Sequence, residues 1–423
     1  MSTRPTPVGQ RGAATLVSVM VLFFIMALMA AYASRNLLFE QRIASNYYRS
    51  GVAVEAADAG VEWTLSMLNA IRIDAACKPD ATSATSFRQR YLNIAPDRTI
   101  TRVNDAYTAG CVRDAQAQWS CQCPNGSFTM PETAAASQMQ PGFRVALLPL
   151  TGTLARPGVV RIQVESCSHA SSECNDLLAS ADVSVGKARV WSDAALMSAL
   201  KTPPAAPLVV KGSVDLGSPG LGLHNSDPGS AGLLAQAGGG ISGQTDRLDS
   251  VPGTPGTEAL LPNASYLLDA GNPDRMFKLH FGMLPRQYRQ QPAMRVLRCD
   301  GDCSTALTEA YGKGIRMIWV DGPLSISSNI TLGSATDPVV LVADGALALD
   351  GPMLLYGLIY AKGNAQLSNG SGLPAQLSGA LLVEGSLSAS GGFDLWYRTE
   401  MMSRISNQMG SFVRVPDSWW EGN

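Results

Sequence analysis

Residues 11–34 read RGAATLVSVMVLFFIMALMAAYAS, and the 22 residues from Ala13 to Ser34 carry no charge. At about 1.5 Å per helical residue this run covers the roughly 30 Å hydrocarbon core of a bilayer. An ordinary secretory signal has a shorter apolar region with a small-residue cleavage site behind it. Here the only glycine beside the run precedes it, at Gly12. Cleavage after Gly12 would leave the apolar segment on the mature chain, so the stretch predicts a retained membrane helix.

The composition predicts a large β-rich body behind this helix. The chain has 423 residues, more than one domain usually holds, so we expect two or three domains. Charged residues make up 16%, and there are 41 glycines and 25 prolines, which favours strands and turns over a helical bundle. The net charge of -2 and the lack of a basic stripe give no electrostatic case for nucleic acid as a partner.

The eight cysteines all follow the apolar run: Cys77, Cys111, Cys121, Cys123, Cys167, Cys174, Cys299 and Cys303. Disulfides persist in oxidising compartments, so an even number of cysteines places the body outside the cytoplasm and the N-terminus inside it. Arginines flank the run on both sides, so charge alone does not orient it.

Sequence proximity suggests two of the disulfides. We expect Cys167 with Cys174 and Cys299 with Cys303, each closing a short polar turn. Cys77, Cys111, Cys121 and Cys123 would pair among themselves, with three connectivities open. The alternative is a zinc site, but Cys121-Gln-Cys123 is C-x-C rather than C-x-x-C. The three histidines, His169, His224 and His280, are not spaced as metal ligands relative to any cysteine pair either. We therefore predict no metal and no cofactor.

The helix is predicted to continue beyond the membrane. No proline occurs between Val8 and Lys78, and apolar residues keep a helical spacing from Leu38 to Leu68. We therefore expect one helix with a membrane half at 13–34 and an amphipathic half at 35–73. Gly51 and Gly60 are the points where such a helix could bend. A single-pass anchor followed by an unrelated linker helix is the alternative.

Three motifs in this region appear in the order found in one family. They are Arg11-Gly12 with the apolar run, EQRIASN at 40–46 and EAADAGVE at 55–62. Together they resemble the N-terminal region of PilX-type minor pilins of type IV pili. The resemblance implies a cytoplasmic leader at 1–12, cleavage by a prepilin peptidase between Gly12 and Ala13, and N-methylation of Ala13. It also implies storage in the inner membrane and assembly with other minor and major pilins through the helix.

One position departs from the common pilin pattern. Most pilins carry a glutamate at the fifth position after the cleavage site, whereas this chain has Val17 there. A carboxylate in lipid is costly, and in a major pilin it is thought to pair with a neighbour's terminal amine. The departure implies a minor, tip-located subunit; K-type pseudopilins of type II secretion share it. The resemblance assigns the assembly role to the helix, at Val17, Glu40, Arg42, Asn46, Glu55 and Asp58.

Residues 74–193 are predicted to form a pilin-like α/β region. Residues 141–150 and 159–168 alternate as strands do, and 180–191 is a third strand candidate. An antiparallel sheet packed on the amphipathic half of the helix would bury both apolar faces. The expected fold class is therefore α+β.

From residue 194 to 423 an internal repeat emerges. Segments at 318–327, 341–350, 359–368 and 381–390 share an apolar triplet, one polar residue, a glycine and an alternating strand, and 208–217 fits upstream. This pattern favours a β-solenoid, in which each unit buries its apolar face only by stacking on neighbours, over successive hairpins of a sandwich. The glycine would permit a corner conformation closed to other residues; the corners are Gly212, Gly322, Gly345, Gly363 and Gly385. We expect the tail, FVRVPDSWWEGN, to cap the last unit.

No catalytic motif is present, so we predict that the protein is not an enzyme. Polysaccharide lyase sites in β-solenoids need clustered acids and bases, and the residues just before the glycines form such a row: Lys211, Asp321, Asp344, Lys362 and Glu384. A row of charged side chains of this kind is more commonly a solvent-exposed ladder along the edge of a sheet. Asp300 and Asp302 are too few to bind calcium unless other oxygens converge.

The sequence thus favours a minor pilin that starts in the inner membrane, with its body in the periplasm, and then reaches the pilus or cell surface. Its role would be pilus biogenesis, with twitching motility or adhesion to an unidentified receptor as consequences. The alternatives are a K-type pseudopilin of a type II secretion system and a single-pass surface protein with a carbohydrate-binding β-solenoid.

Overall fold

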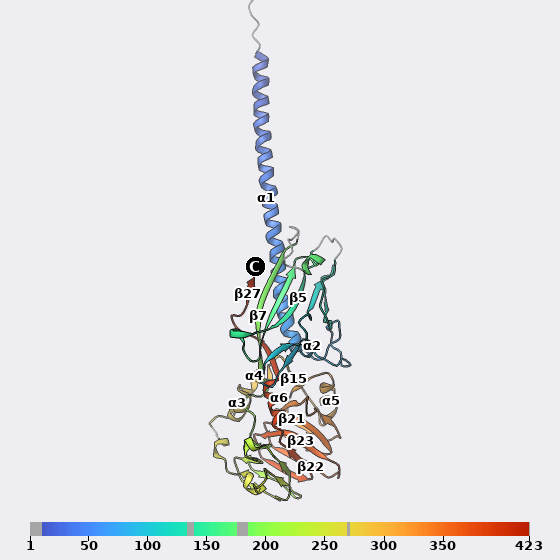
Figure 1. Cartoon of the computed structure of the whole chain (residues 1–423), viewed down its shortest axis with the longest axis vertical. Coiled ribbons are helices and arrows are strands. Elements are labelled where there is room, and N and C mark those ends of the chain that lie inside the picture. The colour runs from blue at the N-terminus through green and yellow to red at the C-terminus, as the bar shows by residue number, and fades with distance from the viewer. Residues whose placement is uncertain (1–10, 133–138, 176–184, 269–270, 423) are drawn as a thin grey trace, which may run out of the picture.

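The computed structural model describes residues 11–132, 139–175, 185–268 and 271–422. One long helix, α1, extends from an elongated body (Figure 1). The half of the body next to this helix contains an antiparallel sheet, and the far half contains parallel strands (Figure 1). The fold class is α+β, as expected from the sequence.

Helix α1 runs without a break from Arg11 to Leu68, 58 residues or about 87 Å. It begins inside the expected leader, of which residues 1–10 lie outside the described part of the chain. It ends at Leu68, short of the expected end at 73, because the next two amides, Asn69 and Ala70, donate to the carbonyls three residues back and tighten the last turn.

The second half of α1 lies on a seven-stranded sheet, which we call the antiparallel layer. Its strand order is β26-β7-β6-β5-β3-β4, with β27 paired to β7. Beside it lie α2 (Phe87–Tyr91) and a small hairpin of β1 (Leu92–Ile94) and β2 (Ile100–Arg102). The strands of the layer are β3 (Ala109–Arg113), β4 (Trp119–Gln122), β5 (Gly142–Pro149), β6 (Val159–Cys167), β7 (Lys187–Ser198), β26 (Gly410–Arg414) and β27 (Trp420–Gly422).

The first two strands expected in this region agree closely with β5 and β6, whereas the third differs. The expected strand covered 180–191, but β7 runs from Lys187 to Ser198, and residues 176–184 lie outside the described part. Alternate residues of β7 are buried through its whole length, up to Leu196. The chain therefore stays in this sheet past the expected domain boundary at 193/194.

The far half of the body is a parallel-stranded stack with two sheets. The smaller sheet contains β12 (Ile241–Ser242), β9 (Val214–Asp215), β24 (Leu387–Gly391), β22 (Ala365–Asn369), β20 (Leu347–Asp350) and β17 (Leu324–Ile326), in that order. The larger sheet contains β8 (Leu208–Val210), β10 (Gly222–His224), β11 (Ala235–Ala237), β13 (Leu248–Asp249), β14 (Leu260–Leu261), β15 (Met294–Leu297), β16 (Met317–Val320), β18 (Thr331–Leu332), β19 (Val339–Ala343), β21 (Met353–Ala361), β23 (Ala375–Val383) and β25 (Asp394–Trp396).

The spatial order of the stacked units differs from their order in the sequence. Strand β8 pairs in parallel with β23 on one side and with β11 on the other, and β9 does the same with β24 and β12. The first unit of the chain thus enters the middle of the stack, beside the last one. The segment 235–242, which is not among the repeat segments recognised in the sequence, supplies a further stacked unit.

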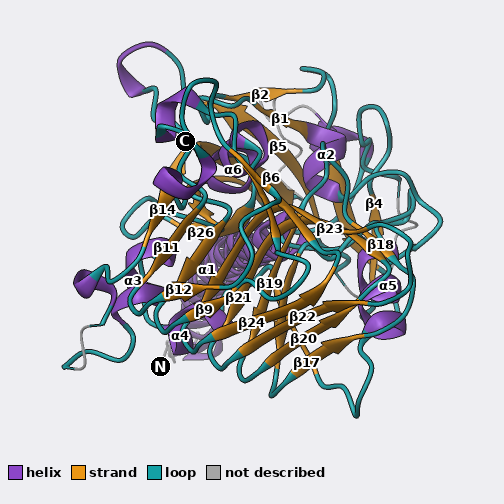
Figure 2. Ribbon diagram, turned by 90° about the horizontal axis from the view of Figure 1, so that it is seen from below, coloured by secondary structure: helices purple, strands orange, loops and turns teal. Residues whose placement is uncertain are grey.

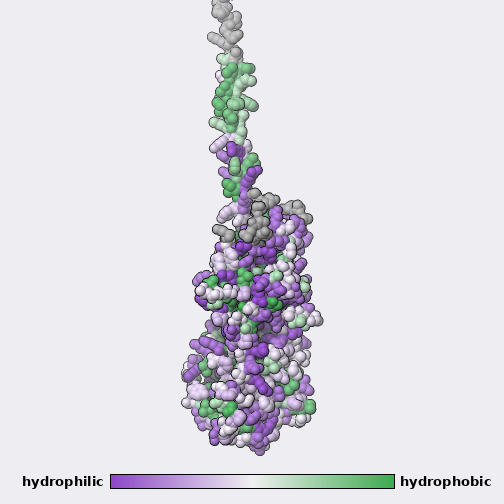
Figure 3. All heavy atoms as spheres, viewed as in Figure 1, coloured by the Kyte–Doolittle hydropathy of each residue, from purple (hydrophilic) through white to green (hydrophobic). Residues whose placement is uncertain are grey.

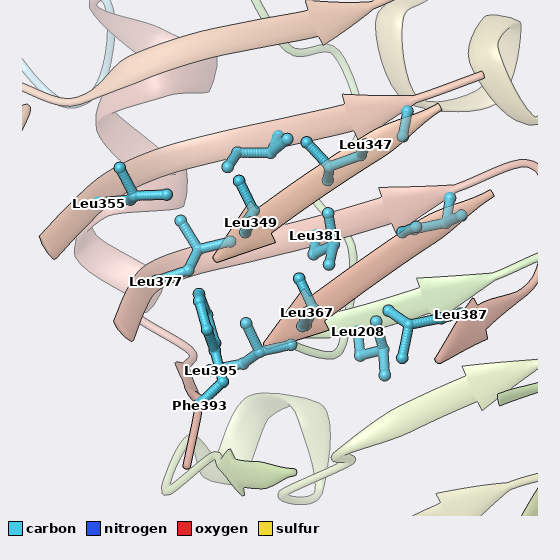
Figure 4. Close-up of a cluster of buried hydrophobic side chains, with 14 of the residues drawn as sticks. Leu208, Leu347, Leu349, Leu355, Leu367, Leu377, Leu381, Leu387, Phe393 and Leu395 are labelled. Atoms are coloured by element: carbon cyan, nitrogen blue, oxygen red, sulfur yellow. The ribbon is translucent and has the colours of Figure 1, made fainter. Parts of the chain in front are cut away.

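Leucine side chains fill the interior between the sheets (Figure 4). Figure 2 shows the strands of the smaller sheet side by side, with α5 (Ser304–Gly312) near β17. Leu307 of α5 is fully buried in the leucine-rich core, so this helix covers that end of the stack. A second apolar cluster lies outside the larger sheet, under α3 (Arg275–Phe281), α4 (Pro285–Arg289) and α6 (Thr399–Asn407).

The glycines expected at corners occupy turns between the two sheets, but at most of them the reason for glycine differs from the expected one. Only Gly322 has a positive φ, +114°. At Gly363 a Cβ would lie 2.7 Å from the backbone nitrogen of Ala346, because the turns stack directly on one another. The Gly363 amide donates to the carbonyl of Gly345, at 2.8 Å, in the turn below. Close approach of neighbouring chain segments therefore disfavours side chains at Gly212, Gly345, Gly363 and Gly385. At Gly322 nothing lies within 4 Å of a Cβ, and the positive φ is the reason for glycine, as expected.

The C-terminal tail does not cap the stack, so that expectation is wrong. Strands β26 and β27 pair antiparallel with β7 and return the chain to the layer beside α1 (Figure 1). The physical reason is that the edge of β7 away from β6 has backbone groups free to pair with β26 and β27, while α5 already covers one end of the stack. The expected domain 194–423 thus contributes two strands to the other half of the body.

Candidate assembly interface

The first half of α1 is an apolar surface that the rest of the chain does not cover. In the most apolar 18-residue window, with mean hydropathy 2.5, no residue is buried. Figure 3 shows these side chains as a hydrophobic column outside the body. Val17 is 59% exposed and Phe23 70% exposed. Apolar surface in water costs about 25 cal/mol per Å², so this half of the helix requires lipid or other helices around it. Length and hydropathy fit a single-pass membrane anchor.

The other residues expected to serve assembly lie further along the same helix, and all of them are exposed: Glu40, Arg42, Asn46, Glu55 and Asp58. The surface of α1 changes from apolar to mixed near Arg35, whose guanidinium lies 5.7 Å from the ring centre of Phe39. Glu40, Arg42, Asn46 and Glu55 are therefore available to neighbouring molecules. Asp58 is exposed too, but it also lies 3.7 Å from Arg414 of the body.

Small residues allow the second half of α1 to approach the antiparallel layer closely. Ala53, Ala57 and Gly60 are buried against it. A Cβ on Gly60 would lie 2.6 Å from Cγ1 of Val164 on β6 and 3.0 Å from Cδ2 of Phe143 on β5. The sequence suggested that Gly60 was a point of bending, whereas it is a packing position. The spacing of small residues in 53–60, three or four apart, was the signal that could have identified it.

Aromatic and polar contacts fix the helix on the layer. Trp63 lies between Phe87 and Phe143, with ring centres 5.6 and 5.7 Å away. The Ser166 hydroxyl donates to the Ala53 carbonyl, at 2.7 Å. The position of α1 relative to the body is therefore set by directional contacts as well as by burial.

The C-terminal strand β26 is joined to the end of α1. The side-chain amide of Asn69 donates to the carbonyl of Phe412 at 2.8 Å, and its oxygen accepts from the Phe412 amide at 2.8 Å. Arg414 forms an ion pair with Glu62 at 3.1 Å, and a longer one, 3.7 Å, with Asp58. The tail therefore stabilises the helix that would join neighbouring subunits, a role that the sequence did not indicate.

All eight cysteines are in disulfides: Cys77–Cys123, Cys111–Cys121, Cys167–Cys174 and Cys299–Cys303. The first links the segment after α1 to the chain beyond β4, across 46 residues of sequence. Cross-links of this kind restrict the unfolded chain, and they leave no thiolate for zinc.

The charged row beside the glycine turns forms ion pairs or hydrogen bonds at Asp321, Asp344, Lys362 and Glu384. Lys362 contacts Asp344 at 2.7 Å, and Asp321 contacts Arg298 at 3.0 Å. Burial raises the pKa of the Glu384 carboxyl, although it accepts a hydrogen bond from the Tyr360 hydroxyl. In the described residues no three His, Cys, Asp or Glu side chains gather as a metal site would require. The row has the character of a structural ladder.

Asp302 caps the start of α5 rather than presenting oxygens for calcium. Its Oδ1 accepts from the Ser304 amide at 3.1 Å and from the Ser327 amide at 3.1 Å, and its Oδ2 accepts from the Ser328 hydroxyl at 2.7 Å. Burial alone would raise the pKa of this carboxyl, but the hydrogen bonds outweigh it and lower the pKa to about 2.

Residues 11–62 match the protein family described as PilX N-terminal. The chain is a type IV pilin-like protein. The resemblance expected from the motifs is thereby confirmed, and the match covers the helix alone. No curated protein matches the chain. Among solved structures, the competence-associated pilin ComZ from Thermus thermophilus is similar at 10% identity, over 88% of this chain and 97% of that chain. Its TM-score of 0.22 is too low to support any argument about this pilin-like chain.

Proposed function

We propose that this pilin-like chain is a minor pilin that takes part in assembly of a type IV pilus. One observation carries the proposal: the segment that matches the PilX N-terminal family has an apolar half that the body leaves entirely exposed. Such a helix is suited to two environments in turn, the bilayer before assembly and a bundle of pilin helices afterwards. Pilins act as structural subunits, so we propose no enzymatic activity.

The maturation we propose follows the order of the N-terminal residues. A prepilin peptidase cleaves between Gly12 and Ala13, and the new amino group of Ala13 is methylated. The disulfide-bonded body faces an oxidising compartment, the periplasm, and the leader faces the cytoplasm. Val17 then lies where a major pilin has its glutamate, so this subunit lacks the carboxylate that would receive another subunit's terminal amine.

The contact surface for other pilins is, in this proposal, the exposed side of α1: Val17, Glu40, Arg42, Asn46, Glu55 and Asp58. We further propose that the parallel-stranded stack is a β-solenoid, supported by the in-register pairing of successive units. It lies at the end of the body away from the apolar helix (Figure 1), where it would project from a pilus tip. Adhesion would then be a property of the stack, and twitching motility a property of the filament.

Two experiments test this function. The first is N-terminal sequencing of the mature protein: a start at methylated Ala13 is expected, and an intact Met1 would refute the proposal in favour of a plain membrane anchor with a surface β-solenoid. The second is deletion of the gene, followed by counting surface pili and assaying secreted proteins. Loss of pili with normal secretion is expected, whereas loss of secretion with normal pili would identify a K-type pseudopilin.

A further inference from the structure

A half-enclosed cavity of about 370 Å³ lies where the antiparallel layer and its neighbours meet the parallel-stranded stack. One wall comes from the segment after α1, from α2 and from β1, and the opposite wall comes from β15, the start of β16 and α6. Figure 1 shows β15 and α6 at this junction. Both halves of the body therefore contribute to a single cavity.

The lining of this cavity is strongly cationic. It contains five arginines and one acidic residue, with no lysine: Arg72, Arg88, Arg295, Arg316, Arg404 and Asp337. The arginines come from five separate segments of the chain, and each is half-buried. The protein as a whole has a net charge of -2, so this concentration of positive charge is local.

Only one of the five arginines is neutralised by a carboxylate. Arg316 donates to both oxygens of Asp337, from Nε at 2.7 Å and from Nη2 at 2.6 Å. In the described part of the chain the other four donate only to uncharged oxygens: Arg72 to the Gly312 carbonyl, Arg88 to the Gly410 carbonyl, Arg295 to the Pro292 and Met294 carbonyls, and Arg404 to the Gln408 side chain. A guanidinium has five N–H donors, so most of the donors in the cavity remain for another acceptor.

Four positive charges around one small volume repel each other, and partial removal from water makes the repulsion stronger. Burial lowers the pKa of Arg88 to about 10, which shows the cost of keeping that charge in this environment. An anion with several oxygens would remove the repulsion and accept hydrogen bonds from arginines of both walls. Arginine is the side chain best suited to such oxygens, because its donors form a planar fork.

We propose that this cavity, the arginine cavity, binds an anion with two or more phosphate groups and thereby fixes the stack against the antiparallel layer. The charge selects the class: one carboxylate would neutralise one of four guanidinium groups, whereas a diphosphate carries about three negative charges. The volume lies in the range of small-molecule sites, roughly 300 to 1,000 Å³. The ligand is either a free polyphosphate or a nucleoside polyphosphate.

The test uses the full chain in detergent micelles and inorganic pyrophosphate as the probe. Isothermal titration should detect saturable binding, and Arg404→Gln should raise Kd roughly tenfold or more, because a hydrogen bond to a charged group is lost. Arg298→Gln is the matched control: its side chain is 81% exposed near β15, pairs with Asp321 and lies outside the cavity. Equal weakening in both variants, or no saturable binding to the wild type, would overturn the proposal.

Two further measurements separate binding from general effects of charge or folding. Sodium chloride at matched ionic strength should not reproduce the rise in Tm that pyrophosphate causes in the wild type; an equal rise would overturn the proposal. Hydrogen exchange of the wild type should slow at 69–72 and 293–295 when pyrophosphate is added, and unchanged exchange at both walls would overturn the clamping role. Tighter binding of ADP than of pyrophosphate would identify the ligand as a nucleoside polyphosphate. Equal binding of the two would identify it as a free polyphosphate. Either result supports the arginine cavity as a binding site.

Discussion

Substitution of Gly60 by alanine tests the packing of α1 on the antiparallel layer. The added Cβ would lie 2.6 Å from Cγ1 of Val164, a distance that a real methyl group does not reach without movement of its neighbours. Val164 is fully buried and β-branched, so its side chain has little freedom to rotate away. The helix must therefore separate from the sheet, or β6 must shift.

The expected magnitude follows from two opposing terms. Alanine in place of glycine inside a helix gains about 1 kcal/mol of helix propensity. Overpacking in a rigid core costs about 1 to 3 kcal/mol. Gly51 isolates the first term, because it is exposed on the same helix and a Cβ there would meet nothing within 4 Å. Gly51→Ala should stabilise the protein by about 1 kcal/mol, and Gly60→Ala should be less stable than Gly51→Ala by about 1 to 3 kcal/mol.

The assay is equilibrium denaturation of the full chain in detergent, followed by far-UV circular dichroism and by tryptophan fluorescence. Fluorescence is informative because Trp63, three residues after Gly60, contacts the same layer. If Gly60→Ala were as stable as Gly51→Ala, α1 would not lie as close to β6 as described, and the reasoning about small residues would be refuted.

Three further predictions concern the tail, the cap of α5 and the stack. Asn69→Ala should reduce the free energy of unfolding, measured in denaturant titrations, by about 2 to 3 kcal/mol, because it leaves backbone groups of β26 unpaired. The control is Asn93→Ala, at an exposed position, which should change the free energy of unfolding little. Asp302→Asn should lower Tm at pH 7. In the wild type the pKa of Asp302 is lowered to about 2, so the ionised carboxylate contributes its full stabilisation above pH about 4 and loses it as the pH falls to about 2. The variant should therefore show a smaller fall in Tm than the wild type between pH about 4 and about 2. An equal fall in both proteins would contradict the capping role. Gly363→Ala should cost about 3 kcal/mol because the methyl group meets backbone, while Gly370→Ala, with open space around it, serves as control; equal stability of the two would exclude the stacked turns.

The long helix and the strands β5 and β6 were predictable because local patterns determine them. A charge-free run of 22 residues and an apolar spacing without proline leave few alternatives to a helix. Alternation in β6 buries Ile162 and Val164 against α1, as a period of two requires. The end of β7 lies at Ser198, beyond the expected 191, because alternation by itself does not reveal where a strand finds its partner.

The candidate interface was predictable in its apolar half only. The assembly role of the exposed residues further along α1 stays a prediction from the motifs. The bond from Asn69 to β26 joins positions 343 residues apart, and nothing in either segment indicates the other. The same holds for the arginine cavity, whose five arginines come from distant parts of the chain.

The sequence alone determined the apolar helix, the family of its first 52 residues, the presence of a glycine-marked repeat and the absence of a basic stripe, since each depends on neighbouring residues or on composition. Only the tertiary structure decided that the first repeat unit stacks beside the last, that the tail returns to β7, and that glycine is required by close backbone approach at Gly363. The physical reason is that edge pairing, close approach and clustering of charge depend on which segments meet in space, and a linear pattern does not specify those meetings.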